Sequence, residues 1–444
     1  MAGGYPRSCS EYRHRCNVQF MDRQRRSLSW HLGSSALWFG QSFKWFILLL
    51  LTLSDQVAKI AGDDSKNAAL GQVFALGATW AAIGPFIMGW LSYRIPAKMG
   101  RHRFFLLVGG FFTVVALIAM RNATTIPMLM ASYLLLQISD DASTGPYSGL
   151  IPERVSEEDR GRASGILAAL RFGAQIAGGI FGAVLSDDLS GIYYGIAIVT
   201  VICTLISVRT LKGEPAFVPS DESKVSFKGL AADFLAPWKS ADFVRVFAVT
   251  WIGNFGYYMI QTYLRNYFDD EIADFRVMNT VIDLKAFTVE DANHAIMFLG
   301  LLISFVGIFG AILATKLTDR IGRKKTVFIG GALMSLPLVP FALIHDFTVV
   351  VSMAPFFAIG MGLYQSASWA LVSDILPNEK AIGTDMGIWQ AAFSSVQIGS
   401  GLLGFVIDGL NKQQPGMGYT GMFLIGATLM FGGALLAQRV RGSH

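Results

Sequence analysis

The chain has 444 residues, of which 53% are hydrophobic and only 15% are charged. Because a soluble globular protein carries about a quarter charged residues, this composition excludes a water-soluble fold. The net charge of +5 does not indicate a nucleic-acid partner, since the basic residues lie in short segments between apolar runs. The cysteines Cys9, Cys16 and Cys203 are too few and too scattered for a disulfide framework or a zinc site. We therefore expect no metal site and no cofactor.

Residues 1–33 form a basic segment with six arginines and no apolar run. A signal peptide would need an apolar core and a small-residue cleavage site, and this segment has neither. We therefore expect a cytoplasmic tail. Met21 is an alternative start of the protein, because residues 1–20 resemble no part of a folded element.

Twelve apolar runs follow, each long enough to cross a bilayer as a helix of about 20 residues. They lie at about 34–53, 68–91, 103–120, 126–149, 162–186, 190–208, 244–266, 292–315, 326–344, 347–372, 384–408 and 419–438. The predicted fold class is an all-α membrane protein with two six-helix bundles. The expected domains are a tail (1–33), an N-terminal bundle (34–211), a cytoplasmic linker (212–243), a C-terminal bundle (244–438) and a cytoplasmic C-terminus (439–444).

The distribution of Lys and Arg predicts the orientation of these spans. When the loops are assigned alternately to two sides, 27 of the 36 basic residues fall on the side of the N-terminus and seven on the opposite side. Cytoplasmic loops carry the excess of basic residues, so we expect both termini in the cytoplasm and the chain in the plasma (inner) membrane. The two remaining basic residues, Lys44 and Arg171, lie inside predicted spans.

An internal repeat relates the two halves at an offset of 222 residues. Gly100-Arg101 aligns with Gly322-Arg323, and Gly165-Ile166 aligns with Gly387-Ile388. The same unit therefore occurs twice in parallel orientation. Parallel repeats are the construction of transporters that rock two bundles about a site near the midplane.

One loop in each half carries a recognisable motif. The loop after the eighth span reads Asp319-Arg320-Ile321-Gly322-Arg323 and then two lysines, which resembles the D-R-x-G-R-K/R signature of the major facilitator superfamily. The first-half copy has four extra residues between its first Arg and its G-R pair, and this spacing resembles the glycoside–pentoside–hexuronide:cation symporters and the sucrose-type transporters. The resemblance implies a gating role for Gly89, Arg94, Gly100, Arg101, Arg103, Asp319, Arg320, Gly322 and Arg323.

This chain departs from the family at three positions. The family has an acid in the first-half loop where this chain has Tyr93, so we expect the charge pairing of that acid to be missing. The sucrose-type pattern has a carboxylate and an Arg at the positions of Gln137 and Ser148. The resemblance therefore does not imply sucrose as the substrate, nor a proton carrier at those positions.

Four ionisable residues lie inside the predicted spans at one depth. Lys44, Asp140, Asp141 and Arg171 are each about ten residues, roughly 15 Å, from the cytoplasmic edge. An ionisable side chain near the bilayer centre is unfavourable by at least about 2.5–3.5 kcal/mol unless it faces a cavity or a partner. We therefore predict a charge cluster that binds the coupling cation. The alternative is an ion-pair network that only fixes helix packing.

Helix geometry separates the two aspartates. Gln137, Asp141, Thr144 and Ser148 share one helical face, and Asp140 lies about 100° away around the helix. This favours Asp141 as the coupling acid and Asp140 as a structural partner.

Polar residues without charge accompany aromatic residues in other predicted spans. Amides can donate to and accept from hydroxyl groups, and aromatic rings cover apolar C–H faces, so the combination suits a neutral polyhydroxylated solute. The candidates for substrate binding are Gln41, Gln137, Gln175, Asn254, Tyr258, Gln261, Gln365, Trp369, Trp389 and Gln390. Alternatively, the Trp and Tyr side chains mark the membrane interface and the amides bond across helices.

These observations and the resemblance lead to one principal hypothesis and two alternatives. The principal hypothesis is a secondary active transporter that moves a sugar or glycoside together with H⁺ or Na⁺. The alternatives are an exporter or uniporter of another small molecule, and a membrane sensor that has lost transport. No nucleophile–base pair is apparent, so we do not predict an enzyme. The expected partners are a small-molecule substrate, a coupling cation and membrane lipid, with no nucleic acid, and the protein is expected to be a monomer.

Overall fold

The computed structural model describes residues 24–61, 66–185, 188–219, 227–284, 288–376 and 382–441. The secondary structure of these residues is helical apart from isolated β-bridges such as that between Gln24 and Val155. The first half contains α1 (Leu28–Ile47), a π-helical segment (Leu48–Thr52), α2 (Leu53–Ala61), α3 (Lys66–Ala81), α4 (Gly84–Ser92), α5 (Arg101–Arg121), α6 (Ile126–Ser148), α7 (Leu150–Arg154), a 3₁₀ turn (Glu157–Asp159), α8 (Arg160–Val184) and α9 (Leu189–Thr210).

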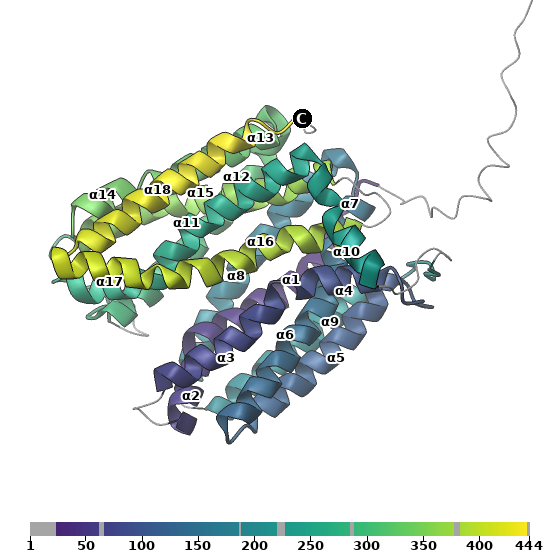
Figure 1. The fold of residues 1–444 in the computed structure, drawn as a ribbon, viewed down its shortest axis with the longest axis horizontal. Helices are drawn as coiled ribbons and strands as arrows, with labels where there is room; N and C mark the ends of the chain where they lie inside the picture. Colours follow the sequence, from purple (N-terminus) through teal and green to yellow (C-terminus); the bar gives the residue numbers. More distant parts are fainter. Residues whose placement is uncertain are drawn as a thin grey trace, which may run out of the picture.

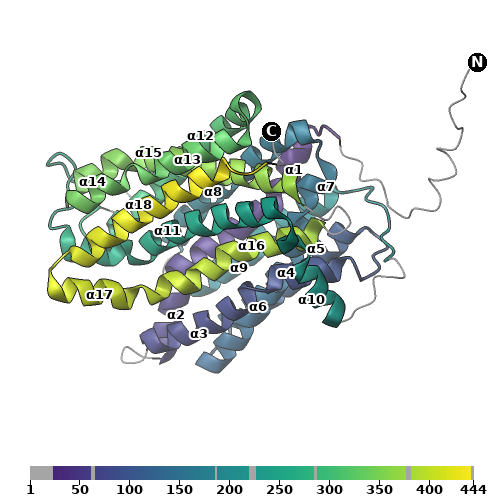
Figure 2. The same cartoon turned by 45° about the horizontal axis from the view of Figure 1, so that its top comes forward.

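The second half contains the linker helix α10 (Phe227–Leu235) and a 3₁₀ turn (Pro237–Lys239), followed by α11 (Ala241–Glu271), α12 (Ala292–Ile321), α13 (Arg323–Ser335), α14 (Leu338–Leu343), α15 (Phe347–Ile375), α16 (Ile382–Leu402), α17 (Gly404–Gln413) and α18 (Met417–Ala437). The two halves form two helical bundles that lie side by side (Figure 1). The start of α1 and the end of α18 lie at the same end of the bundles, which we call the tail end (Figure 2).

Eight helical segments in the described part of the chain are long and apolar enough to cross a membrane. They are Gln72–Ser92, Arg101–Arg121, Glu157–Gly182, Leu189–Thr210, His294–Ile321, Arg323–Leu343, Phe347–Ile375 and Met417–Ala437. Each coincides with a predicted span. The other four predicted spans fall on α1, α6, α11 and α16, which carry polar residues along their length. The total of twelve spans therefore stays a prediction.

Large apolar side chains cover the outer surface of both bundles. Phe111 on α5 is 64% exposed, Ile198 on α9 is 60% exposed and Ile425 on α18 is 55% exposed. Water would disfavour such an apolar surface, whereas lipid chains cover it. These three helices correspond to predicted spans 3, 6 and 12.

Two glycines start the equivalent helices α5 and α13 at the tail end. Gly100 has a φ of 95° and Gly322 a φ of 85°, and each is the N-cap residue of the following helix. Residues other than glycine rarely adopt this left-handed region. The G-R pair of the repeated motif is therefore explained by backbone geometry, since the glycine makes the turn and the arginine begins the helix.

The linker between the bundles carries structure that the sequence did not indicate. Asp233 on α10 accepts hydrogen bonds from the indole of Trp90, at 2.9 Å, and from the guanidinium of Arg94, at 2.6 Å. The ring of Phe234 packs edge-on against Phe86, with centroids 5.1 Å apart. The linker helix α10 is thus bound to the tail end of α4.

Candidate transport site

Lys44 and Asp140 form an ion pair inside the N-terminal bundle, between α1 and α6. Both side chains are almost completely buried. The carboxylate of Asp140 also accepts hydrogen bonds from the indole of Trp45, at 2.7 Å, and from Gln41 and Thr113, each at 3.3 Å. The carboxylate of Asp140 is therefore neutralised and hydrogen-bonded by residues of the N-terminal bundle alone.

Asp141 has a different environment, although it is the next residue along α6. It is only 8% exposed, and its Oδ2 atom completes no hydrogen bond to any described residue. The indole of Trp80 faces this carboxylate, and the two groups meet beside Gly84, at the break between α3 and α4. Because Lys44 is already neutralised by Asp140, Asp141 is a buried acid that has no fixed counter-charge among the residues the structure describes.

Arg171 stands apart from these acids, so the four predicted residues do not form one cluster. Its guanidinium donates to the hydroxyl of Ser42 at 3.4 Å and lies near Tyr257 and Tyr258 of α11. Among the described residues no carboxylate pairs with it. The matched depth of Arg171 and the aspartates stays a prediction from the sequence. Depth does not specify which face of α8 the side chain occupies, however, and that face points toward the C-terminal bundle.

Aromatic rings connect the two bundles near the tail end. Trp38 on α1 packs edge-on against Trp369 on α15, with ring centroids 5.1 Å apart. Trp369 makes the same kind of contact with Trp389 on α16, at 5.2 Å. Trp389 is fixed by a 2.8 Å hydrogen bond from its indole to Thr250. The predicted binding residue Trp369 therefore lies at the contact between the bundles, and the predicted binding residue Trp389 packs against it.

Several predicted binding residues have buried polar atoms without a hydrogen-bond partner among the described residues. They are the Oε1 atom of Gln41, the indole nitrogen of Trp369 and the Nε2 atom of Gln390. Gln365 lies on α15 one turn before Trp369 and is half-buried. A buried polar group without a partner costs free energy, and a hydroxylated solute could satisfy these groups.

Other predicted binding residues are occupied by contacts within the protein or lie on the surface. Gln137 donates to Tyr133 at 3.3 Å, and the side chain of Asn254 donates to the carbonyl of Thr250 at 2.7 Å. Gln261 is exposed. Gln175 accepts a 3.0 Å hydrogen bond from Ser304 of α12, and this bond crosses between the bundles.

The first-half motif forms a network at the tail end that sequence reasoning missed. The hydroxyl of Tyr93 donates to Glu153 at 2.7 Å and accepts from the backbone N–H of Gly383 at 2.9 Å. Arg101 donates to both carboxylate oxygens of Glu153 at 2.6 Å. The acidic pairing expected to be missing at Tyr93 is therefore replaced by hydrogen bonds. This could not be read from the motif, because Gly383 lies 290 residues away.

The second-half motif contributes a further link between the bundles. Asp374 at the end of α15 pairs with Arg160 at the start of α8, at 2.7 Å, and also with Arg323. Arg323 in addition donates to the carbonyl of Glu157 at 2.5 Å. Asp374 pairs with Arg323 as Glu153 pairs with Arg101. Arg101 and Arg323 are equivalent in the repeat, so the repeat was the signal that could have identified an acid near this position. Asp319 and Arg320 are exposed at the same end.

The remaining gating residues also lie at the tail end. Gly89 approaches the C-terminal bundle so closely that a Cβ atom there would lie 2.5 Å from the carbonyl oxygen of Gly383. Arg94 pairs with Asp233 of the linker helix. The backbone N–H of Arg103 donates to Glu214 at 3.2 Å.

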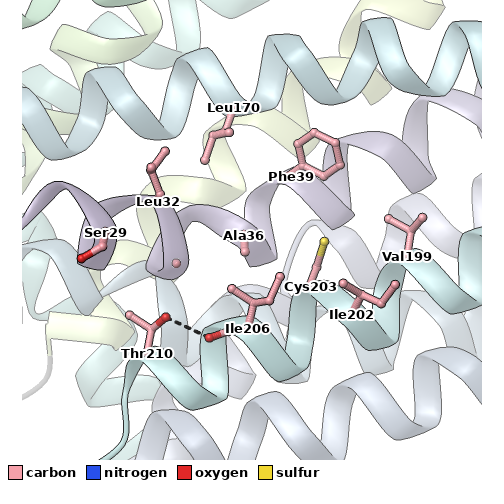
Figure 3. Close-up of a pocket in the computed structure, with 11 residues that line it drawn as sticks. Ser29, Leu32, Ala36, Phe39, Leu170, Val199, Ile202, Cys203, Ile206 and Thr210 are labelled. Atoms are coloured by element: carbon pink, nitrogen blue, oxygen red, sulfur yellow. Dashed lines mark hydrogen bonds between the residues drawn. The ribbon is translucent and has the colours of Figure 1, made fainter.

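A groove of about 640 Å³ lies outside this central region, between α1, α8 and α9 (Figure 3). Its walls are apolar side chains such as Leu32, Phe39, Leu170 and Ile202, with Cys203 at its side. Ile202 is 50% exposed, so the groove opens on the outer surface of the N-terminal bundle. Such a wall suits lipid rather than a polar solute.

These features define a class of protein: an integral, multi-pass helical membrane protein with two repeated bundles, buried charges and linked tail ends. The family model described as Major Facilitator Superfamily matches residues 32–287 and 272–442. The chain belongs to this superfamily, and the sequence-based expectation of a major facilitator transporter is confirmed.

Relatives and solved structures are consistent with this membership. The "Uncharacterized symporter YjmB" of Bacillus subtilis (strain 168) is 24% identical over 426 residues, which cover 87% of this chain and 86% of the relative. The fold is similar to that of the human organic anion transporter MFSD10 (TM-score 0.71, 13% identity, 93% of this chain and 100% of the other). It is also similar to that of the proton:xylose symporter XylE (TM-score 0.70, 13% identity, 93% and 96%).

Proposed function

We propose that the chain is a secondary active transporter that moves a small polar solute, a sugar or glycoside, together with H⁺ or Na⁺. It works by alternating access as a monomer in the plasma (inner) membrane, with both termini in the cytoplasm. The relative named as a symporter supports coupled transport, and the excess of basic residues on the side of the termini supports the orientation.

The observation that carries this proposal is the pair of unlike aspartates on α6. Asp140 is neutralised by Lys44, whereas Asp141 is buried with an oxygen that has no hydrogen-bond partner in the described part of the chain. A buried carboxylate without a counter-charge is costly. Binding of a proton or a Na⁺ ion would remove this cost, so Asp141 is suited to carry the coupled cation.

Solute binding is supported by buried polar groups that come from both bundles. Trp369 offers an indole donor, Gln41 an amide acceptor and Gln390 an amide donor, all without partners among the described residues. A sugar presents hydroxyl groups for such atoms and flat C–H faces for the ring of Trp389. The proposed site therefore takes side chains from both bundles, as alternating access requires.

A second candidate solute is favoured by Arg171. Its guanidinium faces α11 without a carboxylate partner in the described residues. Arginine binds carboxylates with two parallel hydrogen bonds. A solute with an acidic group, such as a sugar acid, would supply the missing counter-charge.

The contacts between the bundles at the tail end support a conformational state that is closed at that end. Arg160 and Asp374, Tyr93 and Gly383, and Trp38 and Trp369 join the bundles there. With cytoplasmic termini, this arrangement is the state closed toward the cytoplasm. Transport then requires these contacts to break while the bundles rock about the proposed site.

A ligand-stabilisation experiment tests the proposed function. The purified protein would be heated in detergent with D-xylose, D-glucose, melibiose or D-glucuronate, each with and without Na⁺, because a ligand that binds the native state raises the melting temperature. We expect at least one sugar to stabilise the protein and to exchange across proteoliposomes. A sugar that binds without any exchange would instead indicate the sensor. No stabilisation and no transport by any of the four would contradict a sugar transporter.

A further inference from the structure

The bundles approach each other closely where α4 and α16 meet at the tail end. A Cβ atom on Gly89 would lie 2.5 Å from the carbonyl oxygen of Gly383, and one on Gly387 would lie 2.5 Å from the carbonyl oxygen of Pro85. Backbone is therefore packed against backbone. A polar side chain at this contact can therefore form a direct hydrogen bond with the backbone of the opposite bundle.

Tyr93 is the polar side chain at this contact. It follows α4 directly, and its hydroxyl oxygen accepts the N–H of Gly383 at 2.9 Å. Gly383 is the second residue of α16, so its N–H has no partner within the helix. The hydroxyl therefore satisfies a free donor of the opposite bundle.

The N-terminal bundle holds this hydroxyl in place. The O–H group donates to Glu153 at 2.7 Å, and the guanidinium of Arg101 lies 3.9 Å from the centre of the Tyr93 ring. Burial raises the pKa of Tyr93 above its usual value, so the hydroxyl stays protonated and able to donate. Burial alone would raise the pKa of Glu153, but the charges of Arg101 and His102 hold it well below its usual range. Glu153 is thus a charged acceptor.

The other half of the repeat shows which residue type occupies the equivalent place. Gly161, at the start of α8, is the counterpart of Gly383 at the offset of 222. A Cβ atom on Gly161 would lie 3.4 Å from an oxygen of Asp319. An acid therefore sits beside the first turn of α8, and a tyrosine sits beside the first turn of α16.

Arg94 explains why an acid is not needed at Tyr93. The guanidinium of Arg94 is neutralised by Asp233 of the linker helix, at 2.6 Å. It also lies over the ring of Trp90, at 3.8 Å. The positive charge next to Tyr93 in sequence is therefore balanced from elsewhere.

We propose that Tyr93 acts as a latch between the two bundles. Its hydroxyl, oriented by Glu153, holds the first turn of α16 to the N-terminal bundle in the state that is closed at the tail end. When the bundles separate, the bond from Gly383 breaks. The bonds among Tyr93, Arg101 and Glu153 lie within one bundle and persist. The latch rests on the chain being an alternating-access transporter and does not depend on which solute or ion it carries.

The distance between the bundles at the tail end tests this latch without any substrate. Spin labels would be attached to cysteines at Lys98 and Lys325, which are exposed in opposite bundles, in a protein with Cys9, Cys16 and Cys203 replaced by serine. Tyr93→Phe removes only the hydroxyl. Because one buried hydrogen bond that is specific to the closed state, the bond from Gly383, is lost, we expect the ratio of long to short distances to rise about fivefold.

Tyr147→Phe is the matched control. Tyr147 is also buried near the tail end, and its hydroxyl donates to the carbonyl of Ser34 at 2.9 Å, within the N-terminal bundle. We expect this variant to leave the distance ratio within about twofold of the parent. If Tyr93→Phe shifts the ratio no more than Tyr147→Phe does, Tyr93 is not the latch.

A second pair of variants removes the donor instead of the acceptor. Gly383→Pro deletes the N–H group, and proline is tolerated in the first turn of a helix. Gly383→Ala keeps the N–H group. We expect the proline variant to shift the distances as Tyr93→Phe does, and the alanine variant to shift them less. Equal shifts in the two variants would contradict the latch. Failure to transport a tested sugar would leave these distances unaffected, so the two proposals fail separately.

Discussion

The ammonium group of Lys44 and the carboxylate of Asp140 form an ion pair that is sealed within the N-terminal bundle. The exposed fractions of the two side chains are 1% and 4%. Trp45, Gln41 and Thr113 complete the hydrogen bonds of the carboxylate. This pair leaves the neighbouring Asp141 as the acid that can change its charge without breaking a fixed contact.

The variant Asp140→Asn should therefore damage the fold. Removing one partner of a buried ion pair leaves the other charge uncompensated, at a cost of about 3–5 kcal/mol. We expect lower expression and a lower melting temperature in detergent, and the double variant Lys44→Met with Asp140→Leu should recover part of the loss. A fully stable Asp140→Asn protein would show that Lys44 finds another partner.

Arg171→Gln tests whether an acidic solute is recognised. Losing a charge-assisted hydrogen bond costs about 1.5–3 kcal/mol, so the apparent affinity for D-glucuronate should fall roughly tenfold or more, while that for D-glucose stays unchanged. Ligand-dependent melting temperatures measure both. Arg121→Gln, at a residue that bonds Ser190, is the control. An equal loss of affinity for both sugars would show that Arg171 contacts a neutral part of the solute or only stabilises the fold.

Glu214 gives the protein a pH-dependent contribution to its stability. Burial alone would raise its pKa, but His102 and the backbone N–H of Arg103 lower the pKa from 4.5 to about 2. Because the folded-state pKa is lowered, the stabilisation is fully present above about pH 4.5 and is lost as the pH falls toward 2.

We therefore expect Glu214→Gln to lower the melting temperature equally at pH 7 and pH 5, with a smaller difference from the parent at pH 3. Glu158, whose side chain is 72% exposed, provides the control. Glu158→Gln should change the melting temperature little at any of these values. If the difference in melting temperature between Glu214→Gln and the parent grew toward pH 3, it would contradict a lowered pKa of Glu214.

The proposed orientation can be tested with two exposed residues at opposite ends of the bundles. Lys412 lies in the last turn of α17, and Arg439 follows α18. Single cysteines at these positions, in the protein without native cysteines, would be treated with an impermeant thiol reagent in intact cells. We expect labelling at position 412 only. Labelling at position 439 and not at position 412 would show that the orientation is the opposite of the one proposed.

The sequence predicted most of the scaffold for physical reasons. A bilayer requires long apolar helices, and eight of the predicted spans coincide with helices that meet this condition. The i, i+4 pattern also separated Asp140 from Asp141, because residues on one helix have a fixed angular relation.

Relations between helices could not be predicted in the same way. Arg171 and Asp141 were expected at one depth, and their side chains have different neighbours. At Tyr93 the sequence indicated only the loss of an acidic group, whereas the structure shows that its hydroxyl bonds to α16. Asp233 lies on a helix within a linker that was expected only as a polar stretch. Each of these contacts depends on how distant helices pack, and no local pattern encodes that packing.

The most direct test of the account is the transport behaviour of Asp141→Asn in proteoliposomes. If Asp141 carries the coupled cation, the variant is permanently neutral there. Accumulation of a stabilising sugar, driven by a proton or Na⁺ gradient, should then vanish, while exchange of labelled sugar continues and the melting temperature stays near that of the parent. A stable Asp141→Asn protein that still concentrates the sugar against its gradient would contradict the account and move the coupling site elsewhere.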